Sequence, residues 1–171
     1  WFLYRKRATT FSPTSEVGKR NIMVSLICVG LLCRLIFTFC VPANLAPDEK
    51  AHLNYIKYIS ENKTLPVQPD VPNAEIGDYE YYQPPLYYLT MALFYNLGNE
   101  LNFSDDTNII QIRFLSIALW LVTAIAAWLT VIKLELKGNF GELFVVALVS
   151  LLPSYMYISS RINNDNLITC L

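Results

Sequence analysis

The only histidine of the chain follows an acidic pair at helical spacing, and this pattern suits acid–base chemistry. His52 lies four residues after Asp48, in a segment where Pro47 and the acidic pair could open a helix. Positions 48, 52, 55, 56 and 59 would share one face of that helix, which is otherwise apolar or aromatic. A partly desolvated carboxylate near an imidazole is suited to act as a general base. The alternative is that Asp48 only interacts with the helix dipole.

Glu49 adjoins Asp48 in the sequence but would point about 100° away from it around the helix. In that direction its carboxylate could orient a substrate or hold a metal ion. A solvated acid in the first turn of a helix needs no such role, and spacing alone favours this simpler interpretation.

A tyrosine-rich stretch over residues 79–88 contains two adjacent prolines. Pro84 and Pro85 restrict the backbone to a rigid extended turn, and Tyr82 and Gln83 directly precede them. The aromatic faces could stack on a sugar or on a prenyl chain. Tyrosines at a membrane surface also form an aromatic belt without any such ligand, and this alternative stays open.

Three arginines lie inside or beside apolar runs, where a guanidinium could form a bidentate contact with a lipid phosphate. Arg34 lies within the first run, and Arg113 and Arg161 lie at the ends of later runs. A charge in a membrane span is costly and often functional, although a side chain near the end of a span can also reach the surface. Next to Arg161, Asn163-Asn164-Asp165 would add a second carboxylate or simply cap a helix.

The elements that carry these residues are predicted to be membrane helices. The chain is 54% hydrophobic and only 16% charged, whereas soluble domains carry about 25% charge. Apolar residues gather in runs at 22–41, 114–132 and 143–160, and a fourth run begins at Leu167. Twenty helical residues cover about 30 Å, the thickness of the hydrocarbon core. The predicted fold class is therefore an all-α membrane protein with about three transmembrane helices and the start of a fourth.

Charged residues predict the orientation of these helices. Five Lys and Arg residues precede the first run, whereas the loop at 42–112 carries ten acids and three lysines. Because basic flanks stay in the cytoplasm, residues 1–21 are predicted to be a cytoplasmic segment and the loop to be extracytoplasmic. Residues 22–171 would form one multi-pass transmembrane domain, expected in a bacterial plasma membrane. No basic patch indicates a nucleic acid as partner.

The loop at 42–112 is predicted to contain two helices of its own. The first would run from residue 47 to about residue 61. Residues 62–84 contain repeated proline and a glycine, which predicts irregular structure. Residues 85–98 are apolar but too few to span a bilayer, so a helix lying on the outer leaflet is expected.

The order of these features resembles the N-terminal part of a GT-C superfamily membrane glycosyltransferase, of the protein mannosyltransferase and aminoarabinose transferase type. A first span is followed by the Asp-Glu pair at 48–49, with His52 close behind. The Pro-Pro-Leu element at 84–86 comes next, and Arg113 and the Asn-Asn-Asp segment at 163–165 follow it.

The resemblance covers about residues 20–171 of this chain and only the first part of such an enzyme. Those relatives carry a histidine or a lysine before the two prolines, whereas this chain has Gln83. Because the resemblance covers only the first part of such an enzyme, the remaining spans would be missing, and we expect these residues alone to have no transferase activity.

The resemblance implies inverting transfer of a sugar from a polyprenyl-phosphate donor to a hydroxyl of a lipid, glycan or protein acceptor. Asp48 would be the general base with Glu49 beside it, or the two would hold a divalent metal. Arg113, Arg161 or that metal would stabilise the phosphate leaving group. The other residues expected to contact substrate are His52, Tyr82, Gln83, Pro84, Pro85, Asn164 and Asp165.

A non-catalytic multi-pass membrane protein, such as an assembly subunit or a transporter component, is the competing interpretation. Its outer loop would be a docking surface, and Asp48 would cap a helix in open solvent. The two interpretations differ in geometry, because an enzyme requires Asp48, Arg113 and Asp165 to converge, whereas a docking surface would leave them scattered.

Overall fold

The computed structural model describes residues 16–43, 45–73, 75–134 and 139–171, and all regular structure in them is helical. Most of the predicted cytoplasmic segment 1–21 lies outside these residues. The helices are α1 (Glu16–Cys40), α2 (Glu49–Asn62), α3 (Leu86–Glu100), α4 (Asp105–Lys133), α5 (Asn139–Leu151), α6 (Pro153–Ile158) and α7 (Asp165–Ile168).

Two helices of the described residues are long and apolar enough to cross a membrane. They are Val17–Cys40 of α1 and Asp105–Lys133 of α4, whose most apolar 18-residue stretches have mean hydropathies of 2.4 and 2.2. Both begin before the predicted spans. Helix α4 starts at Asp105 because the Ser104 hydroxyl accepts a hydrogen bond from Thr107 N at 3.3 Å, and because acids suit the first turn.

The third predicted span, 143–160, is interrupted in the structure. Helix α5 ends at Leu151, Leu152 is extended, and the short helix α6 begins at Pro153. Proline has no N–H and its ring clashes with the preceding turn, so it ends a helix at this point. Helix α5 is apolar but shorter than a membrane span, and the count of three spans stays a prediction.

Arg34 satisfies the carbonyl groups that this interruption exposes. Without an N–H at residue 153, the Val149 carbonyl has no helical partner, and it accepts bonds from Trp120 Nε1 at 3.1 Å and Arg34 Nη2 at 3.4 Å. Arg34 Nη1 donates to the Ser150 carbonyl at 2.9 Å. The guanidinium also lies 3.6 Å from the centre of the Trp120 ring. Arg34 is thus buried in the bundle and neither reaches the surface nor remains open to a phosphate.

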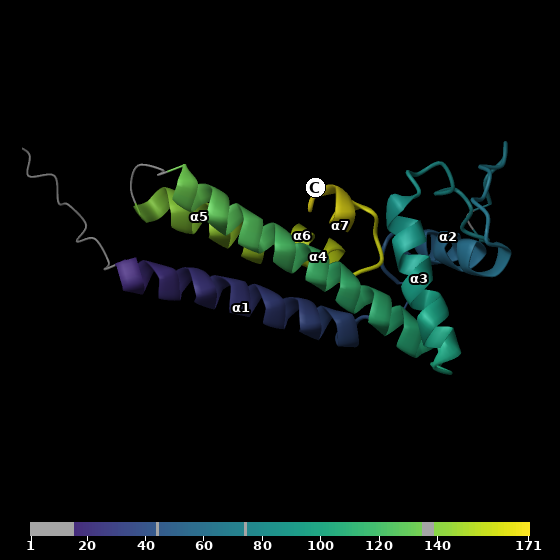
Figure 1. Cartoon of the computed structure of the whole chain (residues 1–171), viewed down its shortest axis with the longest axis horizontal. Coiled ribbons are helices and arrows are strands. Elements are labelled where there is room, and N and C mark those ends of the chain that lie inside the picture. The colour runs from purple at the N-terminus through teal and green to yellow at the C-terminus, as the bar shows by residue number, and fades with distance from the viewer. Residues whose placement is uncertain (1–15, 44, 74, 135–138) are drawn as a thin grey trace, which may run out of the picture.

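Helices α1, α4 and α5 pack side by side, and α2 and α3 gather at one end of them (Figure 1). At this end α1 stops and α4 starts, and α3 packs on both α2 and α4. The segment at 159–165, between α6 and α7, also lies here, because its side chains contact the end of α1. We call this region the site end.

Both predicted loop helices are present. Helix α2 matches the helix expected at 47–61, and α3 matches the one expected at 85–98. The described residues between them form turns and extended segments without a helix, as their prolines predict. Helices α2 and α3 bury a tyrosine-rich cluster between them that also includes Ile112 of α4 and Ile162. This cluster fixes the loop helices against the bundle.

Candidate functional site

At the start of α2, Asp48 is exposed and Glu49 is buried, which is the reverse of what helical spacing predicts. Asp48 lies outside the helix with φ 58° and ψ −5°, a left-handed conformation that Asp tolerates better than most residues. Helical periodicity does not apply to it, so its carboxylate is exposed, and its predicted place on the buried face is wrong. The rest of that face, including His52 and Ile56, is buried as predicted.

Glu49 is the buried acid of the pair. Its side chain is 1% exposed, and it accepts two bonds from Arg113, from Nε at 2.8 Å and from Nη2 at 2.7 Å. The interpretation of Glu49 as a solvated first-turn acid is therefore wrong. Paired N–H donors on a carboxylate form a charge-assisted contact with fixed geometry, and burial requires such pairing.

Arg113 uses all of its N–H donors inside the protein. Besides the two bonds to Glu49, Nη1 donates to the carbonyls of Thr38 and Val41, each at 2.9 Å, and Nη2 donates to the Pro42 carbonyl at 3.3 Å. The last carbonyls of a helix have no helical partner, and a cation there also suits the helix dipole. Arg113 therefore caps α1 and, in this arrangement, has no donor left for the lipid phosphate it was expected to bind.

Arg161 caps the same helix and shares the Val41 carbonyl with Arg113. Its Nη2 donates to the Phe37 carbonyl at 2.7 Å and its Nη1 to the Val41 carbonyl at 3.4 Å. The guanidinium lies 5.3 Å from the centre of the Tyr157 ring. Its Nε is buried without a hydrogen-bond partner. Arg161 thus anchors the segment between α6 and α7 on the end of α1, and its buried Nε–H is left without a partner.

His52 is held as a neutral ring within the α2–α3 interface. A hydrogen bond of 2.8 Å joins its Nδ1 to the hydroxyl of Tyr88, and both side chains are buried. Burial lowers the pKa of His52 to about 4, and the nearby carboxylates of Asp48, Asp165 and Glu49 oppose this shift only partly. At neutral pH His52 is therefore an uncharged, structural hydrogen-bond partner of Tyr88 and is not poised to act as a general acid.

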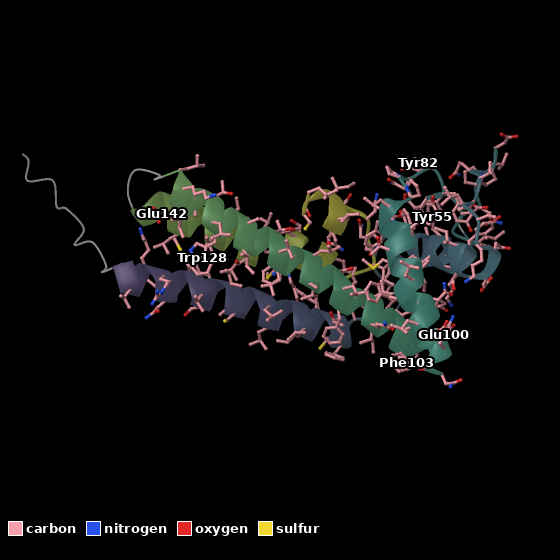
Figure 2. The ribbon with its side chains drawn as sticks, in the orientation of Figure 1. Tyr55, Tyr82, Glu100, Phe103, Trp128 and Glu142 are labelled. Atoms are coloured by element: carbon pink, nitrogen blue, oxygen red, sulfur yellow. The ribbon has the colours of Figure 1, made fainter. Side chains whose placement is uncertain are left out.

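Gln83 and Asn164 lie far apart in sequence and meet at the site end. Asn164 Nδ2 donates to Gln83 Oε1 at 2.9 Å, and Gln83 Nε2 donates to Glu80 at 2.8 Å. Tyr82 is 66% exposed, its hydroxyl accepts a hydrogen bond from Gln83 Nε2 at 3.2 Å, and Figure 2 shows it at the α2–α3 end of the molecule. Two of the predicted substrate contacts are thus brought into direct contact with each other.

The prolines and Asp165 complete the predicted set. Pro84 is exposed, and Pro85 directly precedes the first residue of α3. Asp165 is the exposed first residue of α7, and its backbone N–H donates to the side chain of Asn163 at 2.8 Å. Because Asp48 and Asp165 both act on the pKa of His52, the two exposed carboxylates lie at the same end of the bundle.

Tyr79 belongs to the site but carries no signal of it in the sequence. Its hydroxyl donates to Asp48 Oδ1 at 2.8 Å. Burial and the Asp48 carboxylate raise the pKa of Tyr79 to about 12, so the phenol stays a donor at any physiological pH. The surrounding segment is irregular, so no periodicity could place this side chain against α2. Two further contacts hold the segment there, from Lys50 to the Glu75 carbonyl and from Asn54 to the Ile76 carbonyl.

The acidic pair does not fit the metal site considered from the sequence. Both Glu49 oxygens accept bonds from Arg113, and Asp48 stands apart from it on the surface. No group of three His, Cys, Asp or Glu side chains in the described ranges is placed to hold a metal ion. The site end instead offers two exposed carboxylates, Asp48 and Asp165, and the Asp48 carboxylate has a fixed hydrogen-bond donor in Tyr79.

Comparison of the sequence with protein-family models gave no match, and comparisons with curated proteins and with solved structures gave no significant match. The residues of the chain and their geometry at the site end are therefore the basis on which a function can be proposed.

Proposed function

We propose that this chain is part of a membrane glycosyltransferase that moves a sugar from a polyprenyl-phosphate donor to an acceptor hydroxyl, with inversion at the anomeric carbon. The reaction would take place at the site end. This proposal extends the GT-C resemblance of the sequence, and the geometry of the site end is its support.

The observation that carries the proposal is convergence. The Asp48-Glu49 pair, Gln83, Arg113 and the segment at 161–165 come from four separate parts of the chain. They are joined by direct contacts, from Glu49 to Arg113 and from Gln83 to Asn164. Scattered polar residues of a docking surface would not need such contacts. A shared site explains why they meet at one end of the bundle.

Asp48 is the residue proposed to act as general base. Its exposed carboxylate would take the proton of the acceptor hydroxyl as the acceptor oxygen bonds to the anomeric carbon. The bond from that carbon to the phosphate oxygen breaks, and its electron pair leaves with the phosphate. Tyr79 would hold Oδ1 of Asp48 so that Oδ2 faces the acceptor. His52 is not proposed as an acid, because burial keeps it neutral.

The leaving phosphate needs a positive partner, and Arg113 is engaged elsewhere. Arg161 retains an Nε–H without a partner, so it is the arginine proposed to turn toward the phosphate. The exposed ring of Tyr82 and the amide of Gln83 are the proposed contacts for the sugar, and Pro84 and Pro85 would hold them in place.

The proposed site faces the outside of the cell. Two helices of the described residues are long enough to cross a membrane. Basic residues before α1 and in the connection between α4 and α5 favour a cytoplasmic location for those ends. The site end then lies at the extracytoplasmic surface of a multi-pass membrane domain, with α3 near the outer leaflet.

One observation favours the competing proposal of a non-catalytic docking protein. Asp48 is exposed to solvent at the start of α2, as that interpretation expects, although its side chain does not form the helix cap that the same interpretation predicts. In that case the exposed surface around Asp48 and Tyr82 would contact another subunit.

Transfer of a radiolabelled sugar from polyprenyl-phosphate donors separates the two proposals. The assay would use membranes that express the full-length protein, either wild type or with Asp48→Asn, at matched levels. Asp70→Asn, an exposed acid of the same loop, is the matched control. We expect Asp48→Asn to lose transfer by about 100-fold or more, because a positioned base contributes that much, with the control unaffected. Equal transfer by Asp48→Asn and wild type would remove Asp48 from the mechanism, and no transfer by the wild type would favour the docking proposal.

A further inference from the structure

The ion pair between Glu49 and Arg113 joins three elements of the site end at one point. Glu49 begins α2, and Arg113 belongs to α4. The remaining donors of Arg113 hold the carbonyls of Thr38, Val41 and Pro42 at the end of α1. Both side chains of the pair are almost fully buried. The position of the start of α2 is therefore set by α1 and α4 through Glu49.

The same carboxylate also reaches the segment before Asp165. The backbone N–H of Ile162 donates to Glu49 Oε1 at 3.4 Å, and the neighbouring Arg161 holds the Phe37 carbonyl. Ile162 is itself fully buried in the cluster between α2 and α3. Glu49 therefore contacts both parts of the chain that carry the exposed carboxylates: it follows Asp48 directly, and it binds the backbone of Ile162 shortly before Asp165.

The backbone of Asp48 depends on this anchor. A left-handed conformation is unfavourable for a residue with a side chain and persists only where the surrounding structure imposes it. Asp48 directly precedes the anchored Glu49, and the Tyr79 hydroxyl donates a hydrogen bond to the carboxylate of Asp48. The anchored helix start and the left-handed turn together keep one acid buried and direct the other to the surface.

We infer that Glu49 is a positioning residue, which acts through Arg113 to hold Asp48 and the segment at 161–165 in their working geometry. It does not itself touch the substrate. The inference rests on the proposed function for its effect on catalysis, whereas the positional effect can be measured without any activity.

The kinetic test compares Glu49→Gln and Glu49→Asp in the full-length protein. Glu142→Gln is the matched control, because Glu142 forms another largely buried ion pair, with Lys19 at 2.8 Å, at the opposite end of the bundle (Figure 2). We expect Glu49→Gln to lower kcat by about 100-fold, since a small misplacement of a reacting group costs that much. The KM for the acceptor should stay near the wild-type value. Glu49→Asp keeps the charge and should recover part of the rate, and the control should keep the wild-type rate per folded molecule.

A distance measurement tests the positional effect directly. Spin labels would replace Glu61 on α2 and Ile168 on α7, which are both exposed, in a chain whose native cysteines are replaced (Cys28, Cys33, Cys40 and Cys170). We expect a narrow distance distribution in the wild type and in Glu142→Gln, and a broad or shifted one in Glu49→Gln.

The two measurements separate the possible failures. An unchanged distance distribution in Glu49→Gln would overturn the positioning role whatever the activity. A raised KM with unchanged kcat would also overturn it, because that result indicates direct contact with the acceptor. Absence of transfer in the wild type would count against the proposed function alone, and the distance distribution would still decide the role of Glu49.

Discussion

At the scale of single residues, the site end shows how one left-handed residue changes the chemistry of its neighbours. Asp48 and Glu49 are adjacent acids of similar intrinsic acidity, yet one is exposed and the other is enclosed by Arg113. A charged Glu49 can be buried because its carboxylate accepts hydrogen bonds from Arg113 Nε and Nη2 and from the backbone N–H of Ile162. Local backbone geometry thus decides which acid is available for reaction.

His52 provides a prediction at this scale. Its pKa is about 4 in the folded protein, against about 6.5 when unfolded. A lowered pKa favours the folded state fully above pH 6.5, and this contribution is lost as pH falls from 6.5 toward 4. The loss should reach about 3 kcal/mol in the free energy of unfolding.

The measurement is unfolding of detergent-solubilised protein between pH 7 and pH 4, for the wild type and for His52→Phe. The stability curves of the two proteins should approach each other as pH falls through this window, because the phenylalanine side chain of the variant does not titrate. Parallel curves would show that the histidine is not neutral in the folded state.

At the scale of elements, the interruption between α5 and α6 and the charge in α1 are two parts of one arrangement. Pro153 removes the helical partner of the Val149 carbonyl, and Arg34 and Trp120 supply new donors. The helices can come this close because residue 30 is glycine. A Cβ there would lie 2.6 Å from the Ser150 carbonyl oxygen. A polar backbone inside an apolar bundle requires such partners.

This coupling predicts how two substitutions combine. Arg34→Met should destabilise the protein by about 2–4 kcal/mol, because it leaves buried carbonyls without donors. In a Pro153→Ala background, the new N–H can bond to the Val149 carbonyl, so the same substitution should cost at least about 1 kcal/mol less. Unfolding of the four proteins of this double-mutant cycle in detergent gives the coupling energy. A coupling energy near zero would mean that Arg34 does not serve the helix interruption.

At the scale of the whole molecule, the chain separates a long apolar bundle from a polar end. The bundle packs around one apolar cluster that contains Met23, Trp120 and Val146, and the site end packs around another. Figure 1 shows α2 and α3 confined to one end of the bundle. If α1 and α4 cross a membrane, all the candidate site residues lie on one side of it.

Orientation is the prediction that belongs to this scale. In a chain without native cysteines, a cysteine at Glu61 should react with a membrane-impermeant thiol reagent added to intact cells. A cysteine at Lys133, the last residue of α4, should react only after the membrane is opened. Both positions are exposed, so burial does not explain a difference. The reverse labelling pattern would place the site end in the cytoplasm.

Local sequence features predicted most of the helices, but not the early start of α4 or the break between α5 and α6. Apolar runs of spanning length predicted α1 and α4, and the proline and glycine content of residues 62–84 predicted the irregular segment between α2 and α3. These features depend on periodicity, composition and the missing N–H of proline. They are local properties, and neighbouring residues in the sequence are sufficient to specify them.

Contacts between distant parts of the chain specify which polar residues meet and which remain exposed. The burial of Glu49 depends on Arg113, which follows it by 64 residues, and Asn164 bonds to Gln83 across 81 residues. The left-handed turn at Asp48 breaks the helical spacing on which its predicted position relied. Arg113 was predicted to bind phosphate because the sequence does not show the free carbonyls at the end of α1 that engage it. Desolvation and hydrogen-bond partners depend on the three-dimensional surroundings of a group, so its chemical role could be assigned only after those surroundings were known.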